Sequence, residues 1–151
     1  MQFVLIIMLG YKRLHFMKKQ IIALYGTANS GKSTTLRKLY DLLIKAYPKA
    51  HIEIIHPVGV DFTVIIEIDG VLIGIESQGD PGSRLDDSIK IFKKRGCVII
   101  VCCTRTRGST VVIVEALRPE FTITWHHKIA GQDDDKMAQT ILKQIRDAIG
   151  A

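Results

Sequence analysis

Cysteine is scarce in this sequence of 151 residues, which contains only three. Their number is odd, and Cys97, Cys102 and Cys103 all lie in one apolar run, CVIIVCC, where they are typical of small core side chains. A secreted, disulfide-stabilised protein is therefore not expected, and a reducing, cytoplasmic compartment fits best. Internal repeats, low-complexity segments and linkers are also absent, so the sequence gives no case for a second domain.

Hydrophobic runs long enough to cross a membrane are absent too. The apolar run at residues 1–10, MQFVLIIMLG, is too short for a membrane helix, which needs roughly 20 residues. Lys12 and Arg13 follow this run, whereas a secretory signal carries its positive residues in front. Met17 is a candidate for the true start, so we expect residues 1–16 to be an N-terminal extension, either not native or a tail of a single domain at 17–151.

Charge of one sign is in only small excess. Lys and Arg number 21 against 15 Asp and Glu, which gives a net charge of +6. Such a surplus suits anionic partners, but when spread along a chain it is more typical of a solvated surface. Hydrophobic residues make up 47% of the sequence, which excludes the composition of a disordered chain and predicts a substantial core.

Strand-like runs alternate with helical periodicities from residue 20 onward. Short apolar or alternating runs predict strands at 20–25, 51–56, 97–103 and 121–126. Apolar spacings predict helices from about Lys32 to Pro48, from a Ser83 cap to Gly96, from Ser109 to Leu117 and from about Asp133. The run at 109–117 is also compatible with a strand, and we assign it to a helix because two parallel strands need a crossover.

Asp69-Gly70 lies between two β-rich runs in DFTVIIEIDGVLIGIES (61–77), which is the strongest short signal for a hairpin. A two-residue loop fixes the register of the two strands. The expected pairs are Ile68 with Val71, Ile66 with Ile73 and Thr63 with Glu76.

Residues 26–33 read GTANSGKS, which matches G-x-x-x-x-G-K-[ST] without a gap, between a predicted strand and a predicted helix. Glycines let successive N–H groups point at phosphate oxygens, and the helix adds the positive end of its dipole. Lys32 would supply charge to the β- and γ-phosphates, and the Ser33 hydroxyl would ligate magnesium. The expected phosphate-binding residues are Gly26, Thr27, Ala28, Asn29, Ser30, Gly31, Lys32, Ser33 and Thr34.

Residues 20 to about 105 resemble the core of the P-loop NTPases, whose Walker A motif is the sequence just quoted. The resemblance implies an α/β, three-layer P-loop NTPase fold: a mostly parallel sheet, to which the hairpin adds an antiparallel edge strand, with helices on both faces. It also implies a magnesium–nucleoside triphosphate ligand and a second acidic motif at the end of a neighbouring strand. The whole chain resembles small, uncharacterised bacterial P-loop proteins, which suggests a fold and a ligand but no biological role.

Residues 76–79, ESQG, are similar to the D-x-x-G motif of the GTPase group. There the acid reaches magnesium through water and the glycine N–H, here that of Gly79, touches the γ-phosphate. Glutamate replaces aspartate, so Glu76 either holds the metal or acts on the attacking water, with Asp80 as the acid near the metal. The hairpin register sets Thr63 beside Glu76, so Asp61 and Thr63 are further groups able to approach this metal.

Guanine-specific P-loop proteins carry N/T-K-x-D after the strand that corresponds to CVIIVCC. Residues 104–107, TRTR, stand there instead, so guanine is unsupported and ATP is expected. A guanidinium can neutralise charge on a transferred phosphoryl group, which makes Arg105 and Arg107 candidates for an arginine finger or for a grip on an acceptor's phosphate. The alternative is a solvent-exposed pair.

Other polar clusters have plainer interpretations. Asp133–Asp135 open a helix, where the dipole favours acids. The basic residues at 90–95 have no interleaved aromatic side chain except the inward Phe92, so a solvated face is favoured over a nucleic-acid patch. His126 and His127 are adjacent on a predicted strand, face opposite ways and cannot bind one metal together.

Three classes of function remain. The first is a small ATPase or ATP-driven switch, in which an acid at 76–80 orients water. The second is a phosphotransferase that acts on a nucleotide or small metabolite, although no long arginine-bearing lid is present. The third is a nucleotide-dependent module that binds a protein partner, or, less expected, nucleic acid. The candidate catalytic residues are Lys32, Glu76, Arg105 and Arg107, and the candidate magnesium ligands are Ser33, Glu76 and Asp80.

Overall fold

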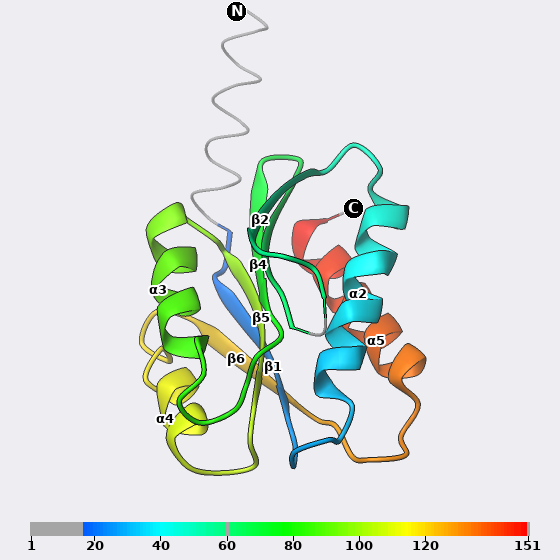
Figure 1. Cartoon of the computed structure of the whole chain (residues 1–151). Coiled ribbons are helices and arrows are strands. Elements are labelled where there is room, and N and C mark those ends of the chain that lie inside the picture. Colours follow the sequence, from blue (N-terminus) through cyan, green and yellow to red (C-terminus); the bar gives the residue numbers. More distant parts are fainter. Residues whose placement is uncertain (1–16, 60, 151) are drawn as a thin grey trace, which may run out of the picture.

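The computed structural model describes residues 17–59 and 61–150 (Figure 1), so the predicted extension at 1–16 lies outside the described residues. The described part is an α/β structure in which one mixed sheet carries helices on both faces. The sheet has six strands in the order β2-β3-β4-β5-β1-β6. They are β1 (Gln20–Tyr25), β2 (His51–His56), β3 (Thr63–Ile68), β4 (Val71–Glu76), β5 (Ile99–Thr104) and β6 (Thr122–His127).

The sheet is mostly parallel, as predicted. β4, β5, β1 and β6 run parallel to one another, whereas β3 is antiparallel to both β4 and β2. The antiparallel strands lie together at one edge, with β2 outermost. β1 and β5 are central and almost continuously apolar because both of their faces are covered, and residues 21–24 have no exposed surface.

The hairpin of β3 and β4 has the predicted register. Its two turn residues both adopt positive φ, 50° at Asp69 and 80° at Gly70, which is the geometry of the tight turns that match strand twist. Ile68 pairs with Val71 and Thr63 pairs with Glu76. A local turn signal therefore determines which side chains reach the far end of the hairpin.

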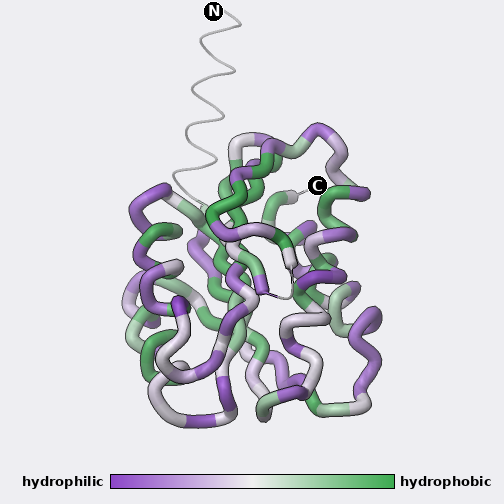
Figure 2. The backbone as a smooth tube through the Cα atoms, viewed as in Figure 1, coloured by the Kyte–Doolittle hydropathy of each residue, from purple (hydrophilic) through white to green (hydrophobic). Residues whose placement is uncertain are grey.

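Four helices lie in the described part: α2 (Lys32–Ala46), α3 (Leu85–Arg95), α4 (Ser109–Glu115) and α5 (Asp134–Ile149). Figure 1 shows α2 and α5 on one face of the sheet and α3 and α4 on the other. Each face has its own cluster of buried apolar residues, and Figure 2 shows hydrophobic residues along the central strands. Within residues 17–59 and 61–150, no helix combines the length and apolar character that a membrane crossing requires.

The predicted cap of α3 is wrong. Arg84 occupies the cap position without a side-chain cap bond, and the Ser83 hydroxyl is buried without a partner. The reason is a turn just before the helix, in which the Ser83 N–H donates to the Asp80 carbonyl oxygen (3.1 Å). The turn places Ser83 one residue too early to cap α3.

Parallel strands end at the same edge of a sheet, so the segments after β1, β4, β5 and β6 all emerge there (Figure 1). The antiparallel β3 begins at that edge, which brings the residues just before it, Asp61 and Phe62, to the same place. Most of the polar residues singled out in the sequence follow one of these strands, and the fold therefore gathers them.

We expect the three thiols to be unreactive in the folded protein. Cys97 is 2% exposed and Cys102 and Cys103 are fully buried. Burial raises the pKa of Cys97 and Cys102 from about 9 to about 12, and that of Cys103 well above its ordinary value. At pH 8 a disulfide reagent should label them slowly, and rapidly only in urea. A Lys90→Cys variant, with its thiol on the exposed face of α3, should show one rapid thiol.

The raised pKa values of the buried thiols make the free energy of unfolding depend on pH. Between about pH 9 and 12 the unfolded chain loses thiol protons that the folded chain keeps, so these thiols lower the free energy of unfolding as pH rises through that window. Urea unfolding measured at pH 8 and pH 10 tests the direction. Fast labelling of any of the three thiols under native conditions would contradict the buried placement.

Candidate functional site

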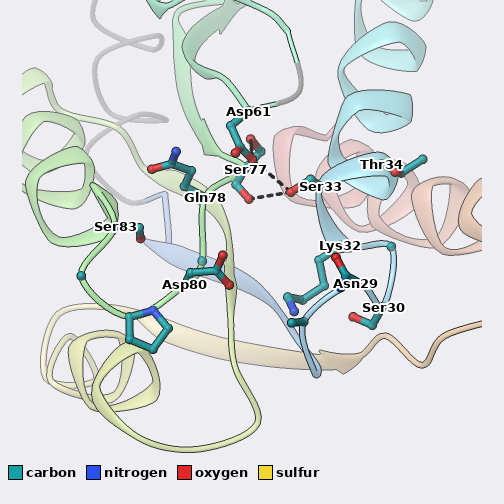
Figure 3. A pocket seen from close by; sticks show the side chains of 15 residues that line it. Asn29, Ser30, Lys32, Ser33, Thr34, Asp61, Ser77, Gln78, Asp80 and Ser83 are labelled. Atoms are coloured by element: carbon teal, nitrogen blue, oxygen red, sulfur yellow. Dashed lines mark hydrogen bonds between the residues drawn. The ribbon is translucent and has the colours of Figure 1, made fainter.

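A cavity of about 570 Å³ opens at the edge of the sheet where the parallel strands end (Figure 3). Three segments line it: residues 28–34 after β1, Asp61 before β3, and residues 77–83 after β4. The predicted phosphate loop and most of the predicted acidic segment therefore share one cavity. Their strands are not neighbours, however, because β5 lies between β1 and β4.

Two left-handed residues shape the loop between β1 and α2. Asn29 has a φ of 59° and Gly31 a φ of 94°. A Cβ atom at Gly31 would lie 2.7 Å from Asp134 Oδ1, and one at Gly26 would lie 2.4 Å from the Lys128 carbonyl oxygen. Glycine is therefore required at 26 by close packing, and at 31 by both packing and backbone conformation.

The backbone N–H groups of residues 27–34 donate no hydrogen bond to any residue in the described part of the chain. The N–H groups on either side are paired, that of Gly26 with Thr104 O and that of Thr35 with Gly31 O. Residues 28–34 line the cavity, and the last of them form the first turn of α2, where the helix dipole is positive. A run of free donors at this position is suited to an anion.

The Lys32 ammonium lies against the same loop. It donates to the carbonyl oxygens of Gly26 (2.8 Å) and Thr27 (2.7 Å). Burial lowers the pKa of Lys32 from its ordinary value, and the negative charge of Asp80 partly offsets that effect. Figure 3 shows Lys32 and Asp80 facing the same part of the cavity. A bound anion would favour the charged form of this lysine.

The Ser33 hydroxyl joins α2 to two other segments (Figure 3). It lies 3.1 Å from Asp61 Oδ1 and 3.2 Å from the Ser77 carbonyl oxygen. The Ser77 hydroxyl also donates to Asp61 Oδ1 (3.2 Å) and accepts from the Phe62 N–H (2.8 Å). Asp61 is thus the carboxylate that the structure brings to Ser33, as the sequence allowed.

Glu76 is placed differently from what we expected of a metal ligand or a base. Its carboxylate is fully buried and does not line the cavity. The four donors that it accepts from are the Thr63 hydroxyl (2.6 Å), the Gln78 N–H (3.0 Å), Arg84 Nε (3.0 Å) and the Ser88 hydroxyl. These bonds occupy the carboxylate and tie the segment after β4 to the start of α3. In this arrangement the Thr63 hydroxyl is bonded to Glu76 and does not line the cavity.

Asp80 lies in the cavity wall and pairs with Arg105, whose Nε is 2.8 Å from Asp80 Oδ1. Arg105 follows β5, so a third strand contributes a charged group at this edge. Neither Arg105 nor Arg107 lines the cavity: Arg105 reaches it through its contact with Asp80, and Arg107 is exposed. Gly79 does line it, and a Cβ there would lie 2.4 Å from the Cys103 carbonyl oxygen, so the chain crosses the end of β5 in close contact.

The sequence did not single out Lys128, or Asp134 as more than one of three helix-opening acids. Lys128 follows β6, is 1% exposed, and donates to the Ser30 carbonyl oxygen in the phosphate loop. Asp134 Oδ1 is 2.7 Å from the Lys128 ammonium. The only signal available was a charged residue directly after an alternating strand, which is weak by itself.

The remaining clusters keep their plain interpretations. Asp133 caps α5 by accepting from the Lys136 N–H (3.1 Å). His126 bonds to Gln144, while His127 stacks on Tyr25. In the part of the chain that the structure describes, no group of three or more His, Cys, Asp or Glu side chains is arranged to hold a metal.

No protein-family model matches this chain, and no curated protein matches it. The interpretation of the cavity therefore depends on its own geometry. The Walker A assignment of residues 26–33 stays a prediction.

We expect Glu76 to be a stabilising residue. Replacing it with alanine removes the acceptor for Arg84 and for two buried hydroxyls, which should lower the free energy of unfolding by about 3–5 kcal/mol. Glu67→Ala, on the exposed face of β3, is the matched control and should cost far less. Urea unfolding of the three proteins measures the difference. A Glu76→Ala protein as stable as the control would show that the buried network contributes little.

Proposed function

We propose that this chain is a P-loop protein that binds magnesium–ATP in the cavity and hydrolyses it, as a small ATPase or ATP-driven switch with the three-layer fold of that class. The observation that carries the proposal is the run of free N–H groups at 27–34, with the Lys32 ammonium beside it. A triphosphate is the ligand that such a surface suits, because it offers an oxygen to each donor and negative charge to the ammonium. The cavity of about 570 Å³ lies within the usual range for small-molecule sites.

Magnesium fits the donors present. The Ser33 hydroxyl and the Asp61 carboxylate lie 3.1 Å apart at the cavity wall, and both are hard oxygen ligands of the kind that Mg²⁺ takes together with phosphate oxygens. In the proposed site these two residues would hold the metal, and Glu76 would not, because its oxygens are occupied elsewhere. The metal would supply positive charge to the phosphates.

Hydrolysis needs a group that accepts a proton from the attacking water and a group that neutralises the charge on the γ-phosphate. Asp80 and Gln78 line the cavity, and Asp80 is 68% exposed, so water reaches its carboxylate. In the proposed reaction a water oxygen attacks the γ-phosphorus, Asp80 accepts the water proton, and the bond to the bridging oxygen breaks to give ADP and phosphate. In the proposal Arg105, which contacts the cavity-lining Asp80, would exchange Asp80 for the phosphoryl group and neutralise the charge that develops there.

The preference between adenine and guanine nucleotides follows from the segment after β5. Thr104–Arg107 contains neither the lysine nor the aspartate of the guanine-binding pattern. The proposal therefore favours ATP over GTP.

Binding is tested by thermal shift and calorimetry with Mg–ATP, Mg–GTP and Mg–ADP. A ligand at 100 times its dissociation constant should stabilise the fold by about 2.7 kcal/mol. Lys32→Met should abolish this shift, and Ser33→Ala should remove its dependence on magnesium. Lys38→Met is the control, since Lys38 is also on α2 but pairs with Asp135 at the surface. No shift with any triphosphate would reject the proposed function.

Turnover is tested by phosphate release from ATP without an added acceptor. Arg105→Ala should reduce the rate by about a hundredfold or more while ATP affinity changes little, because its charge acts on the transition state. Arg107→Ala is compared in parallel, and its exposed position predicts a smaller loss. Release that appears only with an acceptor would identify a phosphotransferase. Tight ATP binding without either activity would leave the nucleotide-dependent binding module.

A further inference from the structure

Lys128 is a lysine that the fold buries completely. Its side chain is 1% exposed, and its Nζ lies close to four oxygen atoms. They are the carbonyl oxygens of Ser30 (2.9 Å), Ile129 (3.1 Å) and Gln132 (3.0 Å), and Asp134 Oδ1 (2.7 Å). An ammonium has fewer N–H donors than this, so none is left for a ligand. Any effect of Lys128 on the cavity must act through the groups that it holds.

The Ser30 carbonyl is the contact that reaches the cavity. Ser30 precedes Gly31, and the carbonyl of one residue and the N–H of the next belong to one planar trans peptide group, in which they point in opposite directions. When Lys128 draws the Ser30 oxygen away from the cavity, it turns the Gly31 N–H toward it. Gly31 lines the cavity, and its N–H is one of the free donors.

Asp134 keeps the buried ammonium in place. A buried charge without a counter-ion is costly, and Asp134 supplies the counter-ion from the first turn of α5. The same oxygen is 3.3 Å from the Thr35 hydroxyl of α2 and packs against Gly31. The pair therefore connects the end of β6 and the start of α5 to the phosphate loop.

We propose that Lys128 and Asp134 form a positioning pair that orients the Ser30–Gly31 peptide group for phosphate binding, an inference that rests on the proposed function. The two charges cancel, so the pair adds little net potential at the phosphates. Its contribution is to fix the donor before the ligand arrives, which reduces the ordering cost of binding.

Replacing Asp134 with asparagine separates positioning from electrostatics. Removing a negative charge near a triphosphate should tighten binding if charge alone mattered. Positioning predicts the opposite, because the ammonium loses its partner and the loop loses its support. Asp135→Asn makes the same charge change at the next residue, where the carboxylate is 73% exposed and pairs with Lys38. It is therefore the matched control.

The first measurement is the dissociation constant of Mg–ATP by calorimetry, at a temperature where every variant is folded. Asp134→Asn and Lys128→Met should weaken binding at least about tenfold, and Asp135→Asn should stay within about twofold of wild type. Asp134→Asn decides the matter if Lys128→Met does not fold. Equal or tighter binding by Asp134→Asn would overturn the pair's role.

The second measurement needs no ligand and separates this inference from the proposed function. In the ligand-free protein, the NMR order parameter of the Gly31 amide should be near the value of about 0.85 for rigid backbone in wild type and Asp135→Asn, and should fall toward about 0.6 in Asp134→Asn. An unchanged order parameter in Asp134→Asn would overturn the inference. A wild type that binds no triphosphate but shows the predicted order parameters would reject the proposed function and retain the positioning.

Discussion

Two lysine side chains bind carbonyl oxygens of the loop between β1 and α2, and the rest of the candidate site depends on this. Lys32 binds those of Gly26 and Thr27, and Lys128 binds that of Ser30. Because a trans peptide group directs its N–H away from its carbonyl, the contact of Lys128 with the Ser30 oxygen favours a Gly31 N–H that faces the cavity. Lys32 itself lines the cavity, and its contacts fix the start of the loop at Gly26 and Thr27. Unpaired donors are a cost to a fold without a ligand, and the two ammonium groups help to hold the loop that carries them. The loop is therefore ordered by its neighbours and not by its own hydrogen bonds.

The position of β5 explains why the acids differ from the pattern expected after β4. The resemblance to P-loop proteins implied an acid at the end of a strand next to β1, but β5 occupies that place. The chain that leaves β4 must cross the end of β5 to reach the cavity, and Gly79 permits the crossing because it lies against the Cys103 carbonyl. Glu76, before the crossing, stays inside and binds α3, whereas Asp80, after it, reaches the cavity.

Much of the fold could be predicted from local patterns. β1 and α2 were predicted from continuous and periodic apolar residues, and the Asp69-Gly70 turn predicted the pairing of Thr63 with Glu76. The cap of α3 could not be predicted, because the Ser83 N–H takes part in a turn with the Asp80 carbonyl just before the helix. Contacts between distant segments were also hidden: Lys128 and Ser30 are 98 residues apart and meet only because β6 pairs with β1. The lining of the cavity by 28–34 and Asp80 was predictable from strand ends, but the burial of Glu76 depends on four donors from separate segments.

Hydrogen bonds, joined by the peptide bond between Phe62 and Thr63, lead from Ser33 to α3. Ser33 contacts Asp61 and Ser77, and Ser77 bonds to Phe62, the residue before Thr63. Thr63 donates to Glu76, which in turn holds Arg84 and Ser88 at the start of α3. A ligand that engages the Ser33 hydroxyl must compete with its bonds to Asp61 and Ser77, and these residues begin the set. In an ATP-driven switch, α3 and the segment at 77–83 would be the parts that respond, because these hydrogen bonds and one peptide bond connect them to Ser33.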